Sequence, residues 1–174
     1  MSPLDDVRPI WIQFAEARRL RYVAEGAAGL PSLEGRRAGT DVVISAVDDA
    51  KHGFRTRATT KANIPLKGNV RVGPAGRWRS VVGRFIGLRL LGDSELDRLF
   101  HVRMSSEALA RTVLDARVLE TVRALAPGRL ELSYAGGAIA IEWAGLERSH
   151  AVLDDVLDAL AHLAVRGSEE TPYR

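Results

Sequence analysis

Apolar and polar positions alternate with the period of a β-strand in several stretches of this chain. The cleanest example is residues 54–61, where the even-numbered positions are small or apolar and the odd-numbered ones are Arg55, Arg57, Thr59 and Lys61. Because successive side chains of a strand point to opposite faces, this pattern predicts a strand with one basic face.

Two longer stretches are typical of β-hairpins. Residues 33–47 are divided by a turn at Ala38-Gly39, and residues 130–143 by a turn at Gly136-Gly137. Glycine supplies the positive φ angles that a two-residue hairpin loop requires. We expect the second hairpin to bury the large apolar side chains of Leu130, Leu132, Ile139, Ile141 and Trp143. Shorter strands are predicted at residues 20–23, 70–72 and 100–104.

Three other stretches show the apolar spacing of helices. They predict helices at residues 9–20, 106–125 and 147–165. Pro9 suits the first turn of the first helix. The last two helices are expected to pack on the second hairpin through Val118, Val122, Leu157 and Leu160. Residues 78–86 also have helical spacing, but the glycines within and after them leave a strand open.

A short helix is predicted to run through Leu99, with Asp93 or Ser94 as its N-cap, and a cluster of carboxylates lies at its start: Asp93, Glu95 and Asp97. Such a cluster suits a cation site or an acid–base pair. Carboxylates at a helix start also accept hydrogen bonds from free backbone N–H groups and complement the helix dipole. We favour this capping interpretation.

The order of these elements predicts the fold class. Hairpins outnumber strand–helix–strand units, which favours an α+β fold in which two long helices pack on an antiparallel sheet. We assign residues 1–166 to a single domain and residues 167–174 to a polar tail. A helix followed by a hairpin occurs in both residues 1–90 and residues 91–166, so a duplication of this unit is an alternative description of the domain.

Composition narrows the classes of protein to consider. Hydrophobic residues make up 46% of the 174 residues and charged residues 27%, which is typical of a globular domain. The absence of cysteine excludes disulfides, thiolate catalysis and iron–sulfur clusters. No stretch approaches the roughly 20 apolar residues of a membrane span, and no signal peptide is recognisable. We therefore expect a cytoplasmic protein, and the excess of arginine over lysine suggests a GC-rich bacterial genome.

Charge is distributed unevenly along the chain. Residues 51–89 contain 10 basic and no acidic residues, whereas residues 1–50 contain 6 basic and 8 acidic and residues 90–174 contain 9 basic and 14 acidic. Such a segment is expected to bind an anion, with a strength that depends on salt. The tentative anion-binding residues are Arg55, Arg57, Lys61, Arg71, Arg77 and Arg79. The alternative is that these side chains pair with the acidic flanks, for example with Asp154, Asp155 and Asp158.

One segment resembles a known signature. Residues 92–102, which read Gly-Asp-Ser-Glu-Leu-Asp-Arg-Leu-Phe-His-Val, are similar to the pattern Gly-Asp-x-Glu-Phe-Asp-x-x-Phe-x-Val of a bacterial family of uncharacterised proteins with a domain of unknown function. Leu96 replaces the aromatic residue of that pattern. The Leu-Glu-Gly sequence at residues 33–35, Gly39 and the C-terminal order of helix, hairpin and helix are also similar. The resemblance implies a shared fold and no activity.

No catalytic or metal-binding pattern is recognisable, so we predict no cofactor, no metal and no catalytic residue. Two histidine–aspartate couples, His150 with Asp154 and Asp158 with His162, have the four-residue spacing of one helix face. We interpret them as solvated ion pairs rather than as a metal clamp. His101 is expected to be exposed. The three tryptophans, at positions 11, 78 and 143, are expected in the core.

Three hypotheses about function follow. The first is a non-catalytic binding or adaptor module that acts through contacts with a protein partner. The second is an anion-binding module that uses residues 51–89 on nucleic acid or an anionic membrane surface. The third is an enzyme whose site is assembled from residues distant in sequence, which we consider weaker because no local motif supports it.

Overall fold

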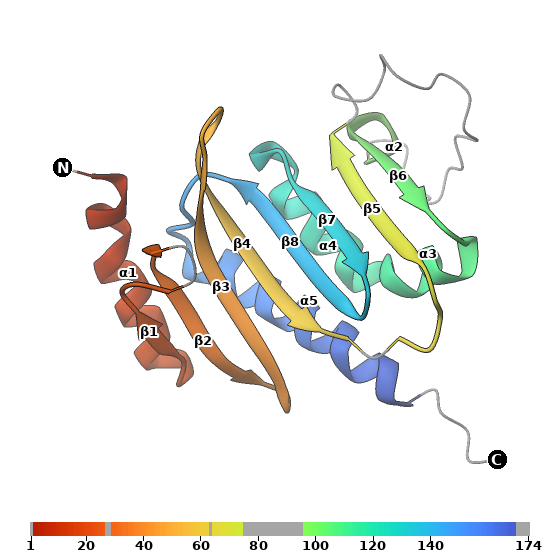
Figure 1. Cartoon of the computed structure of the whole chain (residues 1–174), viewed down its shortest axis with the longest axis horizontal. Coiled ribbons are helices and arrows are strands. Elements are labelled where there is room, and N and C mark those ends of the chain that lie inside the picture. Colours follow the sequence, from red (N-terminus) through yellow and green to blue (C-terminus); the bar gives the residue numbers. More distant parts are fainter. Residues whose placement is uncertain (1, 27–28, 63, 75–95, 170–174) are drawn as a thin grey trace.

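Eight antiparallel strands form one sheet within the residues that the computed structural model describes, which are 2–26, 29–62, 64–74 and 96–169 (Figure 1). The strands are β1 (Arg21–Val23), β2 (Ser32–Arg37), β3 (Thr40–Asp49), β4 (Gly53–Lys61), β5 (Asn69–Pro74), β6 (Phe100–Met104), β7 (Glu131–Ala135) and β8 (Ala138–Ala144). The helices are α1 (Pro3–Arg18), α2 (Leu96–Leu99), α3 (Glu107–Val113), α4 (Ala116–Leu125) and α5 (His150–Glu169), with a 3₁₀ helix at Ala126–Gly128. The predicted α+β class is confirmed.

Both predicted hairpins are present. The β2–β3 turn places Ala38 and Gly39 at φ angles of 48° and 83°, and the β7–β8 turn places Gly136 and Gly137 at 58° and 78°. Positive φ at both turn positions matches the right-handed twist of the flanking strands, which is why the two turns favour glycine. The strand predicted at residues 54–61 is also present, as β4.

The strand order is β1-β2-β3-β4-β8-β7-β5-β6, so the second hairpin lies between β4 and β5. The sheet therefore joins residues of both proposed halves, since β4 pairs with β8 and β5 pairs with β7. The helix–hairpin duplication stays a prediction. Helix α5 continues to Glu169 and so enters the segment that was expected to be a polar tail.

Helix α1 begins earlier than predicted. The Ser2 hydroxyl accepts a hydrogen bond from the Leu4 amide, and the Asp5 carboxylate accepts one from the Ser2 amide. This capping box satisfies two free N–H groups and starts the helix at Pro3, which leaves Pro9 inside it rather than in its first turn. The prediction for Pro9 was wrong because the cap defines the start of the helix, and a proline that suits a first turn does not by itself mark one.

The single helix predicted at residues 106–125 is divided into α3 and α4. Leu114 adopts φ −104° and ψ 56°, and the Asp115 carboxylate accepts a hydrogen bond from the Val118 amide at 3.0 Å. Aspartate stabilises a helix more as an N-cap than within it, so the chain ends one helix before Asp115 and begins another after it. Apolar periodicity continues through the break and did not reveal it.

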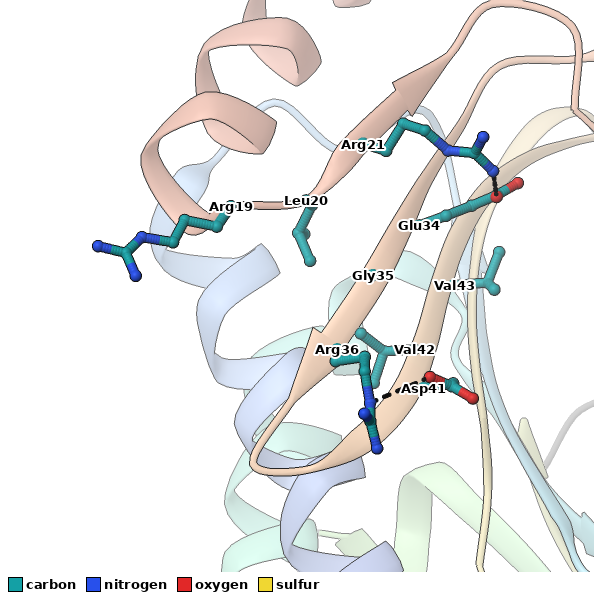
Figure 2. Close-up of a pocket in the computed structure, with 9 residues that line it drawn as sticks. All are labelled: Arg19, Leu20, Arg21, Glu34, Gly35, Arg36, Asp41, Val42 and Val43. Carbon is teal, nitrogen blue, oxygen red and sulfur yellow. Dashed lines mark hydrogen bonds and ion pairs between the residues drawn. The ribbon is translucent and has the colours of Figure 1, made fainter.

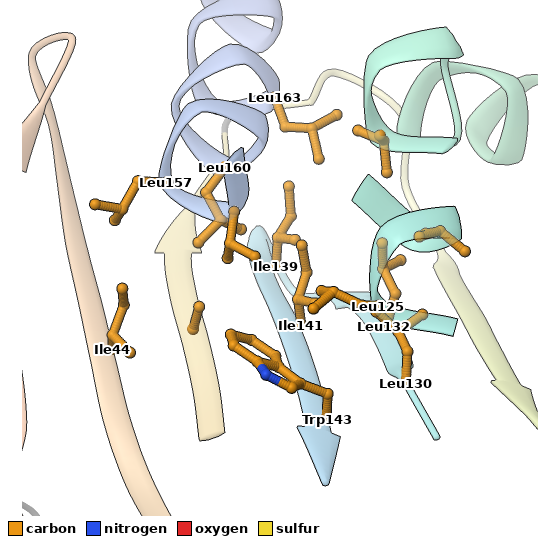
Figure 3. Packing of buried hydrophobic residues seen from close by; sticks show 14 of the residues in the cluster. Ile44, Leu125, Leu130, Leu132, Ile139, Ile141, Trp143, Leu157, Leu160 and Leu163 are labelled. Atoms are coloured by element: carbon orange, nitrogen blue, oxygen red, sulfur yellow. The ribbon is translucent and has the colours of Figure 1, made fainter. Parts of the chain in front are cut away.

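The hydrophobic core lies between the sheet and helices α4 and α5 (Figure 3). All five hairpin side chains expected there are at most 2% exposed: Leu130, Leu132, Ile139, Ile141 and Trp143. The facing helix residues Val118, Val122, Leu157 and Leu160 are fully buried. Trp11 of α1 is buried as well, so the core predictions are confirmed for the residues described.

Candidate functional site

The helices cover one face of the sheet and leave the other, which we call the open face, lined with polar side chains. Helices α4 and α5 pass behind the strands in Figure 1. On β4, Thr56, Ala58 and Thr60 are buried on the helix side, whereas Arg57 and Lys61 are exposed on the open face. The predicted basic face of this strand therefore points away from the core.

A hollow of about 490 Å³, the central groove, lies in the middle of the open face. Its floor is formed by small side chains of β7 and β8, including Ser133 and Ala140, which are directly opposite each other. Arg57 of β4 stands on one side of this floor, and Arg71 of β5 and Arg103 of β6 stand on the other. Long side chains beside short ones produce the depression.

Arg55 is placed differently from the other basic residues of β4, because it is only 5% exposed. Its Nε lies 2.8 Å from Oε1 of Glu142, and its Nη1 lies 4.0 Å from carboxylate oxygens of both Glu131 and Asp49. Its Nη2 also donates to the carbonyl oxygen of Arg129 at 3.3 Å. Arg55 is thus an internal counterion for carboxylates of three strands.

The buried arginine reduces a local repulsion between two carboxylates. Glu131 and Glu142 are directly opposite each other across the β7–β8 pair, where like charges destabilise a sheet. Arg55 lies close to both of them and reduces their repulsion at one end of the central groove. Arg71 adds a second counterion, since its Nη2 donates to Glu131 at 3.1 Å.

The remaining candidates for anion binding are distributed as follows. The side chains of Arg57 and Arg71 are 48% and 54% exposed, although Nε of Arg57 lies 4.0 Å from Oε2 of Glu142, and Lys61 is exposed at the end of β4. Arg77 and Arg79 lie outside the described residues. Pairing with acidic flanks does occur, but through Glu131, Glu142 and Asp49.

Two aspartates of α5 form ion pairs with arginines that lie outside residues 51–89. Asp154 binds Arg18, while Asp158 binds Arg37 and Arg117. A hydrogen bond from Arg18 lowers the pKa of the Asp154 carboxyl below its ordinary value, and the same contact raises the pKa of Arg18. These ion pairs join α5 to α1, β2 and α4, so the basic residues that approach α5 come from outside residues 51–89.

The open face keeps an excess of positive charge after this pairing. Among the described residues of β4 to β8, five cationic side chains accompany two carboxylates on that face. The cationic residues are Arg55, Arg57, Lys61, Arg71 and Arg103, and the carboxylates are Glu131 and Glu142. Asp49 of β3, the third carboxylate that contacts Arg55, reduces this excess from three charges to two. Arg103, Glu131 and Glu142 were not among the predicted site residues, although strand alternation could have assigned their faces.

A second hollow of about 690 Å³ lies at the other end of the sheet, beside β1, β2 and β3 (Figure 2). Four of its five charged lining residues form two pairs within the chain, since Arg21 donates to Glu34 at 2.6 Å and Arg36 lies 3.5 Å from Asp41. The bond from Arg21, followed by one from Ser32, lowers the pKa of Glu34. Because most of its charges are already paired, this hollow is the weaker candidate for a binding site.

Gly35 explains the shape of the second hollow. A Cβ atom at this position would lie 2.7 Å from Cδ2 of Leu20 and 3.3 Å from its Cα, so a larger residue would require the Leu20 side chain to move. Figure 2 shows Leu20 pointing toward this glycine. The close approach positions β1 along only half of β2, from Ser32 to Glu34.

The histidine–aspartate couples of α5 do not act as pairs. His150 contacts the carbonyl oxygen of Ile10 at 3.2 Å and the ring of Phe14 at a centroid distance of 5.3 Å, while Asp154 binds Arg18. His162 contacts Asp115 at 2.6 Å rather than Asp158. The prediction of ion pairs within the helix was wrong, because partners from other elements were closer.

Among the residues that the structure describes, no group of three or more histidine, aspartate or glutamate residues could hold a metal ion. The predicted capping by Asp93 and Glu95, and the start of the family-like signature, lie outside the described residues. His101 is exposed, as expected. No helix among the described residues is long and apolar enough to cross a membrane.

Comparison with known proteins finds a protein with a similar fold but does not identify the role of this chain. No protein-family model matches the chain, and no curated protein matches its sequence. The structure is similar to the crystal structure of the mycobacterial trehalose monomycolate transport factor A, TtfA, with a TM-score of 0.61 over 95% of this chain and 97% of that chain. The two sequences are 14% identical, so the similarity concerns the fold alone.

Proposed function

We propose that this protein is a non-catalytic binding or adaptor module that contacts a protein partner through the open face of its sheet. The observation that carries the proposal is the central groove, a hollow with charged walls on the face that the helices leave uncovered. Concave surfaces with a few convergent polar groups are the usual sites of recognition.

The remaining surface and the comparison support the same proposal. Large apolar side chains are confined to the core, with only Leu99 strongly exposed among the described residues, so a partner must recognise polar and charged groups. The protein with a similar fold is named as a transport factor rather than as an enzyme. Both observations agree with a role in binding.

A variant that fills the central groove tests the proposal. In Ala140→Arg, a long side chain stands on the groove floor, whereas Ala151→Arg adds the same side chain at an exposed position of α5. Each full-length protein is immobilised, and proteins captured from a lysate of the source cells are quantified by mass spectrometry. We expect a partner that the wild type and Ala151→Arg retain and Ala140→Arg loses. Equal capture by all three proteins, with their folding confirmed by circular dichroism, contradicts the proposal.

A second candidate is an anion-binding module for nucleic acid or an anionic membrane surface. It is favoured by the excess positive charge around Arg57, Lys61 and Arg71. Retention on heparin in a salt gradient tests it, because binding through phosphate contacts weakens steeply as salt rises. Elution of the wild type at low salt contradicts anion binding. A variant with Arg57, Lys61 and Arg71 changed to Gln that is retained as strongly as the wild type also contradicts it.

A further inference from the structure

The two walls of the central groove carry positive charge at a defined separation. Arg57 and Lys61 lie on β4, and Arg71 lies on β5, with β8 and β7 between these strands. Neighbouring strands are about 4.8 Å apart, so three steps place the walls roughly 14 Å from each other. This width accommodates one extended polypeptide with side chains reaching both walls, whereas a DNA duplex is wider.

The floor between the walls is smooth and uncharged along most of its length. The open-face residues of the hairpin are Ser133, Ala135, Ala138 and Ala140, which follow from the registers of β7 and β8. Glu131 and Glu142 close one end, where Arg55 lies close to both of them. Toward the Gly136-Gly137 turn, the floor therefore carries no carboxylate, and the nearest cations are Lys61, in register with Ala138, and Arg71, in register with Ser133.

Other polyanions fit this surface less well. Single-stranded nucleic acid is usually bound by stacking bases on aromatic rings, yet every phenylalanine, tyrosine and tryptophan in the described part of the chain is at least partly buried. Proteins that lie on a membrane insert large apolar side chains, and the groove floor carries only alanine and serine. Carboxylates suit the site better, because a guanidinium group binds them through two parallel hydrogen bonds.

We infer that the central groove binds an extended acidic segment of the protein partner, whose carboxylates contact Arg57 on one wall, Lys61 beyond it on β4, and Arg71 on the other wall. This inference rests on the proposed function, because it names the chemistry of the segment that the open face recognises. The segment lies along β7 and β8, where Lys61 and Arg71 flank the uncharged part of the floor toward the Gly136-Gly137 end and Arg57 stands beside Glu142 at the other end.

Binding of a defined acidic peptide tests the inference. A fluorescein-labelled peptide of alternating glutamate and serine is titrated with the full chain, and anisotropy is measured at low and at physiological salt. The wild type is compared with Arg57→Gln/Lys61→Gln and with a matched control, Arg8→Gln/Arg19→Gln, which removes two exposed charges from α1 and its end. We expect the groove variant to bind roughly tenfold more weakly, about threefold for each exposed ion pair lost, and the control to bind like the wild type.

The same titration compares the acidic peptide with other ligands. A peptide with glutamine in place of glutamate is expected not to bind. The inference is overturned if the acidic peptide fails to bind, if the groove variant binds it as tightly as the wild type, or if single-stranded oligothymidylate or phosphatidylglycerol vesicles bind the groove more tightly than the peptide.

Partner capture separates this inference from the proposed function. If Ala140→Arg loses the partner and Arg57→Gln/Lys61→Gln retains it at full strength, the open face is the binding surface and the acidic segment is refuted. If neither variant loses a partner, the proposed function itself fails. Loss of the partner by both variants supports the two proposals together.

Discussion

Arg55 and Arg57 show how two identical residues on one strand face acquire different roles. Both belong to the odd-numbered face of β4, but Arg55 is 5% exposed and surrounded by Asp49, Glu131 and Glu142, whereas the side chain of Arg57 is 48% exposed. An arginine whose charge is used internally stabilises the sheet, and one whose charge reaches solvent is available to a ligand. The functional value of a basic residue here is decided by its neighbours across the sheet.

Replacing Arg55 is expected to destabilise the protein strongly. In Arg55→Gln, Glu131 and Glu142 remain opposite each other without their buried counterion, and breaking a buried pair in this way costs about 3–5 kcal/mol. Urea denaturation measures the change in the free energy of unfolding. Arg57→Gln, the control on the same strand face, should change that free energy by less than about 0.5 kcal/mol.

The double variant Arg55→Gln/Glu142→Gln provides a second check. Removing one of the two opposed carboxylates together with the arginine should restore part of the lost stability, since less uncompensated charge remains. If Arg55→Gln is as stable as the wild type, the internal counterion role is incorrect.

At the scale of secondary-structure elements, caps rather than apolar periodicity define where helices begin. Ser2 and Asp5 start α1 before Pro9, and Asp115 starts α4 within a stretch whose apolar spacing is continuous. Asp115 has a second contact, because its other carboxylate oxygen lies 2.6 Å from Nε2 of His162. The same side chain thus caps α4 and joins it to α5.

Loss of the Asp115 cap is expected to cost stability. Asp115→Ala leaves the Val118 amide without its acceptor and His162 without its partner, and N-cap deletions cost about 1 kcal/mol, up to about 2. Asp115→Asn keeps the cap and should lose less. Thermal unfolding followed by circular dichroism measures both variants, and equal melting temperatures for Asp115→Ala and the wild type would contradict the expectation.

The contact between α1 and α5 is expected to make stability depend on pH. Arg18 donates to Asp154 through Nε at 2.7 Å and through Nη2, which lowers the pKa of the carboxyl in the folded protein. A depressed carboxyl pKa stabilises the fold above the unfolded value of about 3.9, and this contribution is lost as the pH falls through the folded value.

The variant Asp154→Asn measures the contribution of the Asp154 charge to stability. Because the ion pair is partly exposed and screened by solvent, the variant should be less stable than the wild type by no more than about 1 kcal/mol at pH 6. The difference should shrink as the pH falls below about 4, where the wild type also loses the charge. Denaturation curves at several pH values measure it, and a difference that stays constant down to pH 2 would show that the carboxylate charge is not responsible.

At the scale of the whole molecule, a single core links elements from both ends of the chain. Ile141 of β8 is fully buried, pairs with Ala58 of β4 and Leu132 of β7, and lies under α5 (Figure 3). The core therefore depends on strands whose residues are more than eighty positions apart. A defect at this point should weaken the entire sheet rather than one hairpin.

Ile141→Ala is expected to reduce the free energy of unfolding by about 2–5 kcal/mol, because it removes buried methyl groups and leaves a cavity. Denaturant unfolding followed by both tryptophan fluorescence and circular dichroism should show one coincident transition at a lower midpoint. Separate transitions for the two signals would indicate that the halves unfold independently, contrary to a shared core.

Much of the local structure follows from sequence alone. Alternation identified β4 and assigned its basic and buried faces, glycine pairs located both hairpin turns, and the hairpin's apolar residues were correctly expected in the core. These features are local, because side-chain direction, positive φ angles and apolar periodicity depend on residues a few positions apart. The uneven distribution of charge was also visible, and it identified Arg57 and Arg71, which lie on opposite sides of the central groove.

Tertiary structure alone decided which strands are neighbours, and the candidate site depends on that choice. Inserting β7 and β8 between β4 and β5 brings Glu142 to Arg55, places Arg71 and Arg103 across a floor of alanine and serine from Arg57, and so forms the groove. Alternation assigns a side chain to a face but says nothing about the strand beside it. The strand order was set by burying one shared core across distant segments, a property of the folded chain that no single stretch of its sequence contains.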